Sequence, residues 1–288
     1  MKPKDLAFGF KDEYMHMFGI NNIGSIFHIN KREQFAVTPK EIIKYERNQI
    51  LKRFRFHFSI GCLIDTYNMV AFITEHNSNL CIFSLKDMSR PLVSNYPLNQ
   101  TGIFHILYSP RSNCLITVGT GVKVWQVSLE NSYQSSILDP TIKINLRSDF
   151  AYDKYETAIL NPPSFDYNRE LIFLPTSQGI KGFNLNGYME ISMSRLPAKS
   201  NTPIGYCQSN GKLITSDLHE GICLWDKDGK IKGTYTVCSS SILSLNFITP
   251  EHVLILNCQG AIFILNLKTG RSYHIYTSPM IPNRLILQ

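Results

Sequence analysis

Residues 213–230, LITSDLHEGICLWDKDGK, carry the pattern that decides the fold. Two apolar segments of strand length, LITS at 213–216 and ICLW at 222–225, flank a polar turn that contains Gly221. A second turn, with Gly229, follows the second segment. Short apolar runs bounded by Gly, Asp and Ser are typical of β-strands joined by tight hairpins. This stretch therefore predicts two adjacent strands of an antiparallel sheet.

The same pair of strands recurs along the chain. Strands equivalent to 213–216 are predicted at 35–38, 71–74, 115–118, 172–175 and 254–257, with starts 36, 44, 57, 41 and 41 residues apart over the six units. The partner strands end at Glu46, Leu85, Val127, Leu185, Asp226 and Leu267. A preceding strand is readable in several units, for example at 60–64, 103–108 and 242–247, and a weaker strand follows. Four antiparallel strands per roughly 40 residues predict the blade of a β-propeller.

The predicted fold class is thus all-β, a β-propeller of four-stranded antiparallel blades, six of them recognisable. The first 22 residues and those from 280 to 288 lie outside the six units. They would either complete a seventh blade from both ends, or leave six blades with a short N-terminal helix, or make the chain one piece of a longer protein. The predicted organisation is an N-terminal segment, 1–22, followed by a propeller over 23–288.

The wide spacing between the third and fourth units predicts an insertion at about 128–157. This range contains a polar stretch at 130–136 and a charged stretch at 147–156. We expect it to form a long surface excursion.

These units resemble the WD-repeat β-propeller family, most closely at 213–230, with weaker versions at 108–127 and 252–271. Trp125 and Trp225 occupy the family's tryptophan position at the end of the third strand, where the other units have Tyr45, Phe83, Phe183 and Leu265. No Gly-His dipeptide occurs, and His219 stands where the family's turn aspartate is expected. The resemblance implies a non-catalytic scaffold within a larger assembly. A GTGVKVW-type turn at 119–125 is similar to those of cytoskeletal and axonemal propellers.

Composition indicates a reduced, intracellular chain. The first 20 residues contain six charged side chains, which excludes the apolar core of a signal peptide, and no apolar run is long enough for a membrane span. The seven cysteines are odd in number, lack a C-x-x-C pair and mostly lie within apolar runs, so we expect free, buried thiols. The predicted localisation is cytoplasmic, including cilium or cytoskeleton.

No pattern predicts catalysis, a cofactor or a metal site. His219-Glu220-Gly221 lacks the second histidine of a zinc-protease helix, and residues 226–229, DKDG, lack the later acidic ligands of a calcium loop. Both fit strand-to-strand turns, as does Gly119-Thr120-Gly121. We therefore expect that the chain is not an enzyme, and that Gly229 adopts a positive φ in its hairpin.

Charge provides the one functional signal. The net charge is +7, and residues 31–55 hold eight Lys or Arg against three Glu. In LKRFRFHF, at 51–58, Arg53, Arg55 and His57 would share one face of a strand. The structural interpretation is a solvated outer strand whose charges prevent the sheet edge from pairing with another chain. The functional interpretation is a surface for proteins with acidic faces, with nucleic acid as the alternative partner; its candidate residues are Lys40, Lys44, Arg47, Arg53 and Arg55.

Overall fold

The computed structural model describes the backbone of residues 25–28, 33–37, 42–46, 49–54, 58–74, 78–100, 102–130, 141–152, 163–193, 202–216 and 221–277. Side chains are described from residue 60 onward within these ranges, except at 130 and 141. The residues before Ser25 and after Thr277, on which the prediction of an N-terminal helix or a seventh blade depends, lie outside the described part. No helix of the described residues is long and apolar enough to cross a membrane.

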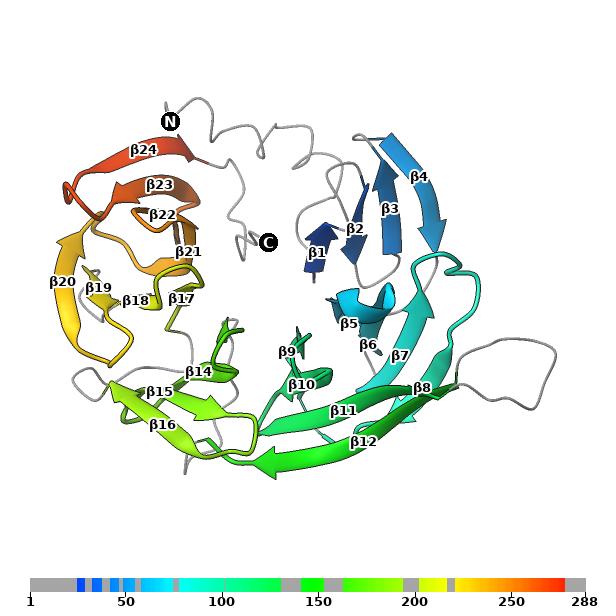
Figure 1. The fold of residues 1–288 in the computed structure, drawn as a ribbon. Helices are drawn as coiled ribbons and strands as arrows, with labels where there is room; N and C mark the ends of the chain where they lie inside the picture. The colour runs from blue at the N-terminus through cyan, green and yellow to red at the C-terminus, as the bar shows by residue number, and fades with distance from the viewer. Residues whose placement is uncertain are drawn as a thin grey trace. The chain divides into compact units, whose positions relative to one another are not determined.

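The described strands form six four-stranded antiparallel sheets, in each of which the strands follow chain order (Figure 1). The first sheet has β1 (Ser25–His28), β2 (Glu33–Val37), β3 (Ile42–Glu46) and β4 (Gln49–Phe54). The second has β5 (Phe58–Ile64), β6 (Met69–Thr74), β7 (Asn79–Ser84) and β8 (Val93–Pro97), with the short 3-10 helix η3 (Asp65–Tyr67) between β5 and β6. The third has β9 (His105–Ser109), β10 (Cys114–Val118), β11 (Val122–Glu130) and β12 (Thr141–Phe150).

The remaining three sheets follow the same plan. The fourth has β13 (Ser164–Asp166), β14 (Leu171–Thr176), β15 (Gly179–Asn184) and β16 (Met189–Met193). The fifth has β17 (Ile204–Cys207), β18 (Lys212–Ser216), β19 (Gly221–Trp225) and β20 (Ile231–Thr236). The sixth has β21 (Ile242–Thr249), β22 (His252–Asn257), β23 (Ala261–Asn266) and β24 (Ser272–Thr277). The six predicted units are therefore confirmed as six four-stranded blades, and the fold is all-β.

The range predicted as an insertion, about 128–157, contains regular strands. Strand β11 continues to Glu130, and β12, from Thr141 to Phe150, pairs with it over nine positions. Residues 128–130 belong to β11, and residues 141–150 form β12, in which Ile142, Ile144 and Leu146 alternate with polar residues. Residues 131–140 and 153–157 lie outside the described part, so the surface excursion stays a prediction.

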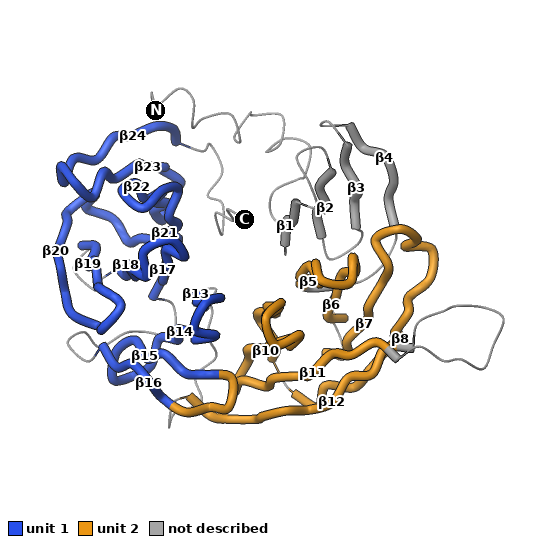
Figure 2. The backbone as a smooth tube through the Cα atoms, in the orientation of Figure 1, with its two compact units in different colours: residues 1–22, 159–184, 189–287 blue, residues 23–158, 185–188, 288 orange. Residues whose placement is uncertain are grey.

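The chain divides into two compact units, which Figure 2 colours separately. Unit 1 contains residues 159–184 and 189–287, and unit 2 contains residues 23–158 and 185–188, each with one more terminal stretch. Within unit 1, β13 contacts β17, and β17 contacts β21, so the fourth, fifth and sixth blades pack in series. Within unit 2, β5 contacts both β1 and β9.

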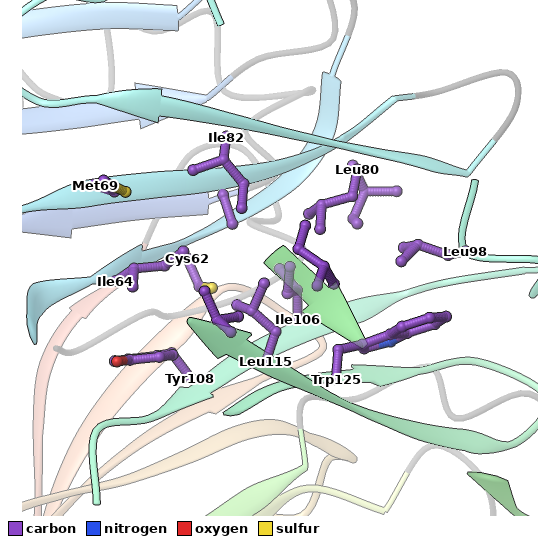
Figure 3. Packing of buried hydrophobic residues seen from close by; sticks show 14 of the residues in the cluster. Cys62, Ile64, Met69, Leu80, Ile82, Leu98, Ile106, Tyr108, Leu115 and Trp125 are labelled. Atoms are coloured by element: carbon purple, nitrogen blue, oxygen red, sulfur yellow. The ribbon is translucent and has the colours of Figure 1, made fainter. Parts of the chain in front are cut away.

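Each unit has its own core between adjacent blades. In unit 2, Trp125 packs with Leu80, Leu98, Ile106 and Leu115, which come from two neighbouring blades and their connection (Figure 3). In unit 1, Trp225 lies in a cluster with Leu171, Phe173 and Met193 of the preceding blade. The third-strand residues Phe83, Trp125, Phe183, Trp225 and Leu265 are all buried, as the repeat pattern predicted. Large apolar side chains at this position fill the space between blades, where each removes apolar surface from water.

Both tryptophans also make a polar contact that fixes their orientation. The indole N–H of Trp125 donates to Thr117 Oγ1 at 3.0 Å, and that of Trp225 donates to Thr215 Oγ1 at 3.0 Å. In the third blade, Thr117 Oγ1 donates in turn to Gln100 Oε1 at 2.6 Å. Gln100 Nε2 donates to the carbonyl of Gly121 at 2.9 Å. Gln100 thus links Thr117 to the turn at Gly121. Nothing in the sequence indicated this link, because the Gly-His dipeptide and the turn aspartate of WD repeats are absent.

The cysteines agree with the prediction of free thiols. All seven are free, and five of them are buried: Cys62, Cys81, Cys114, Cys207 and Cys223. Cys238 and Cys258 are partly exposed. The strand residues behave as small core hydrophobes, because burial raises the pKa of both Cys62 and Cys81 and disfavours their thiolates.

Candidate interaction surface

The structure describes only part of the basic segment singled out in the sequence. Lys44 lies in β3, opposite Lys52, and Arg53 lies in β4, opposite Ile43. Lys40, Arg47 and Arg55 lie outside the described residues. Because β4 ends at Phe54 and Phe58 begins β5 in another sheet, the single strand predicted over 51–58 is wrong. A role of these five basic residues in binding stays a prediction.

The turn at 226–229 is a hairpin, as predicted. Gly229 has a φ of 76°, which only glycine adopts without strain. Asp226 Oδ1 accepts the backbone N–H groups of Asp228 at 3.0 Å and Lys230 at 2.9 Å, while Oδ2 pairs with Lys232 at 3.2 Å. The carboxylate that would have begun a calcium loop is engaged within its own turn. His219 and Glu220 lie outside the described residues, and the described part holds no group of three His, Cys, Asp or Glu placed to hold a metal ion.

Three turns of unit 1 meet at one end of the fourth and fifth blades. They are the β13–β14 turn (residues 166–170), the β17–β18 turn (208–212) and the β19–β20 hairpin (226–230), which together we call the three-turn surface. Arg169 Nη1 donates to the carbonyl of Lys227 at 3.2 Å, joining the first turn to the third. A Cβ added at Gly211 would lie 3.3 Å from Cβ of Lys227, so the second turn touches the third as well.

Asp166 is buried beneath this surface and holds several of its residues by hydrogen bonds. Its side chain is 1% exposed, at the end of β13, yet it accepts four hydrogen bonds. Oδ2 receives Arg169 Nε at 2.5 Å and the hydroxyl of Tyr206 at 2.6 Å. Oδ1 receives the backbone N–H of Asn168 at 2.9 Å and that of Arg169 at 3.2 Å. A buried carboxylate is tolerated only when it is paired and hydrogen-bonded in this way.

The pKa values at this site follow from the same contacts. Burial by itself would raise the pKa of Asp166, but the hydrogen bonds from Tyr206 and Arg169 and the guanidinium charge outweigh burial and hold it below its usual value. Burial, reinforced by the Asp166 carboxylate, raises the pKa of Tyr206 to about 12. At neutral pH the site therefore contains a carboxylate, a guanidinium and a neutral phenol, which hold one another in place.

The exposed Tyr167 is held by contacts with both Phe165 and Gln208. Tyr167 is 42% exposed, and its ring packs edge-on against buried Phe165, with ring centroids 5.0 Å apart. Its backbone N–H donates to Gln208 Oε1 at 3.1 Å. Gln208 Nε2 donates to the carbonyl of Phe165, which ties the second turn to β13. The result is an exposed tyrosine and an adjacent arginine on a rigid turn.

A related arrangement occurs in unit 2. Tyr108 in β9 and Tyr206 in β17 occupy the same place in their blades, since they pair with Leu115 and Leu213 of the next strand. Tyr108 hydrogen-bonds Thr66 in the first turn of the preceding blade and donates to Asn113 Oδ1 at 2.9 Å. Burial raises the pKa of Tyr108 to about 12. A first-strand tyrosine that reaches back to the preceding blade's turn is thus a repeated device of this chain.

Sequence reasoning did not identify Asp166, Arg169 or Tyr206. Asp166 and Tyr206 are 40 residues apart, and neither belongs to a recognisable motif. The available signal was weak: Tyr108 and Tyr206 fall at equivalent positions of the repeat. Their partners differ, so alignment of the repeats alone would not have identified the buried carboxylate.

The comparisons with known proteins show the fold and no family. No family model and no curated protein matches the sequence. The structure is similar to the crystal structure of the WD40 beta propeller domain of Doa1, at 11% identity and a TM-score of 0.62, over 90% of this chain and 84% of that one. KlHsv2 with loop 6CD replaced by a Gly-Ser linker has 11% identity and a TM-score of 0.64, over 90% of this chain and 83% of that one.

A designed protein has the same architecture. The computationally designed Ika8 protein matches at 14% identity and a TM-score of 0.60, over 88% of this chain and 73% of that one. At such identities the likeness shows the fold alone, namely four-stranded blades of the WD40 β-propeller type. Function must be argued from the surface of this chain.

Proposed function

We propose that the chain is a non-catalytic scaffold that binds other proteins as a subunit of a larger intracellular assembly. WD40 propellers generally serve as platforms for protein interaction, because rigid blades hold many loops in fixed relation. A cytoplasmic assembly of cytoskeletal or axonemal type is our first candidate, on the resemblance of its repeats to propellers of that group.

One observation carries the proposal: exposed Tyr167 packs on buried Phe165 and is tied to Gln208, and the partly exposed Arg169 beside it is held by buried Asp166. Tyrosine and arginine are the residue types that most often dominate binding energy at protein interfaces. A side chain already fixed in one conformation loses little entropy when a partner binds. The three-turn surface therefore has both the composition and the rigidity of an interface centre.

The test is affinity purification with the whole chain and two matched variants. Tyr167→Ala removes the exposed ring of the three-turn surface, and Tyr273→Ala removes an equally exposed ring, at 49%, from β24 of the same unit. We expect the wild-type chain and Tyr273→Ala to retain a common set of proteins that Tyr167→Ala loses. Each retained protein is then purified and its binding measured directly.

Two outcomes would contradict the proposal. One is a chain that retains no protein but converts a small substrate. The other is a bound set that disappears after nuclease treatment, which would favour the nucleic-acid alternative based on residues 31–55. Circular dichroism of both variants shows whether the fold is intact.

A further inference from the structure

Three lysines lie on the three-turn surface without an ion-pair partner among the described residues. They are Lys212, Lys227 and Lys230; the last two are exposed, and no carboxylate of the described part lies within 4.0 Å of any of the three amines. The contact of Gly211 with Lys227 brings the second and third turns together, so three cations without counter-charges lie on adjoining turns and favour the approach of an anion.

The nearby acidic residues do not cancel this charge. Asp166 is buried beneath Arg169, whose side chain is 36% exposed, so the positive end of that pair faces outward and the negative end inward. Asp226 is paired with Lys232 and bonded to its own hairpin. Asp228 is exposed on that hairpin, and Glu170 already makes an interaction of its own. The solvent-facing charge is therefore four positive groups against two negative ones.

Arg169 retains donors for an incoming ligand. A guanidinium has five N–H groups in a planar fork. Asp166 takes the one on Nε, the carbonyl of Lys227 takes one on Nη1, and the hydroxyl of Tyr206 also hydrogen-bonds the guanidinium. The other N–H groups belong to a guanidinium that is held in one orientation. A planar guanidinium in a fixed orientation binds carboxylates with good geometry.

We infer that the three-turn surface binds an acidic linear segment of a partner protein. Its carboxylates contact Arg169, Lys212 and Lys227, and an apolar side chain of the segment packs on the ring of Tyr167. The inference rests on the proposed function and names the chemistry of the partner. A peptide fits better than nucleic acid, since the surface offers one exposed ring and a compact group of cations, whereas single-stranded nucleic acid needs a basic track with successive rings.

The test uses a fluorescein-labelled peptide with a run of glutamates beside one leucine, and the same peptide with glutamines, against the whole chain. The variant Lys212→Glu/Lys227→Glu reverses two charges of the surface. The matched control, Lys268→Glu, reverses an exposed lysine in the equivalent hairpin of the next blade. We expect the glutamate peptide to bind, the glutamine peptide to bind at least about tenfold more weakly, and added salt to weaken binding.

The double variant should lose about tenfold or more in affinity for the glutamate peptide, while Lys268→Glu stays within about twofold of wild type. Equal losses in both variants would show non-specific attraction and overturn the inference, as would equal binding of the two peptides. Displacement of the peptide by a uridine oligonucleotide would overturn it in favour of nucleic acid. If affinity purification yields a direct protein partner whose binding the double variant does not change, the scaffold proposal stands and only this inference fails.

Discussion

Substitution of Asp166 by Asn tests whether the buried carboxylate holds the fourth and fifth blades together. Asparagine has nearly the same shape, and its oxygen still accepts the backbone N–H groups of Asn168 and Arg169. Its amide NH₂, however, is a donor and faces two other donors, Arg169 Nε and the hydroxyl of Tyr206. The change therefore removes two hydrogen bonds to a charged acceptor without creating a cavity.

The expected cost is about 2–4 kcal/mol of unfolding free energy. A hydrogen bond to a charged group contributes about 1.5–3 kcal/mol. The lower part of that range applies here, because Arg169 is 36% exposed and regains hydration when its partner is lost. Tyr206→Phe removes one of the two bonds and leaves Asp166 paired with Arg169, so it should cost about 1–2 kcal/mol. The double variant should cost about 1 kcal/mol less than the sum of the two single ones, because both lose the same contact.

The chain offers a clean reporter for this measurement. It has two tryptophans, of which Trp225 lies in unit 1 and Trp125 in unit 2. In a Trp125→Phe background, fluorescence during urea unfolding follows unit 1 alone. All variants are compared in that background at pH 7, and both the midpoint and the slope of the transition are recorded.

A loss below about 0.5 kcal/mol for Asp166→Asn, which is the usual size of a surface substitution, would refute the argument that this carboxylate is structural. Strict additivity of the two substitutions would refute the direct contact between Asp166 and Tyr206. A matched control is Asp228→Asn, an exposed carboxylate on the adjacent hairpin, which should leave the midpoint unchanged.

The remaining predictions concern a glycine that lies close to a neighbouring backbone, the ionisation of two tyrosines and the reactivity of the cysteines. Gly205→Ala should destabilise unit 1 by about 1–3 kcal/mol in the same assay, because the added Cβ would lie 2.9 Å from the carbonyl oxygen of Leu245. Gly233→Ala should cost less, because the nearest atoms to its added Cβ belong to the side chain of Tyr235, at 3.1 Å or more. Tyr108 and Tyr206 ionise near pH 10 in the unfolded chain and near pH 12 in the folded chain, so the free energy of unfolding should fall as pH rises from about 10 to about 12. Tyr206→Phe should lessen that fall, and a variant with the same pH profile as the wild type would contradict the burial of Tyr206. Thiol labelling of the native chain should modify Cys238 and Cys258 first and leave the five buried cysteines unmodified, and rapid reaction of Cys62 or Cys223 would contradict their placement in the core.

The sequence by itself determined where the second and third strands of each blade lie. Apolar segments such as 213–216 and 254–257 alternate with Gly-, Asn- and Asp-containing turns, and this local pattern depends only on backbone geometry and on the need to bury one face. It predicted β18, β22 and their equivalents, the burial of Trp125 and Trp225, and the positive φ of Gly229. It did not assign β12, although Ile142, Ile144 and Leu146 alternate with polar residues there, because the wide spacing of the units placed this range in an insertion.

Only the tertiary structure decided how polar side chains that are distant along the chain meet. Gln100 reaches Thr117 across 17 residues, and Tyr206 reaches Asp166 across 40. Such contacts depend on the packing of one sheet against the next, which repeat spacing does not encode. A buried carboxylate that fixes an exposed arginine is therefore invisible in the sequence, where Asp166 reads as an ordinary turn residue. Strand periodicity is a local property of the chain, whereas the interaction surface arises from contacts between residues that are distant along it.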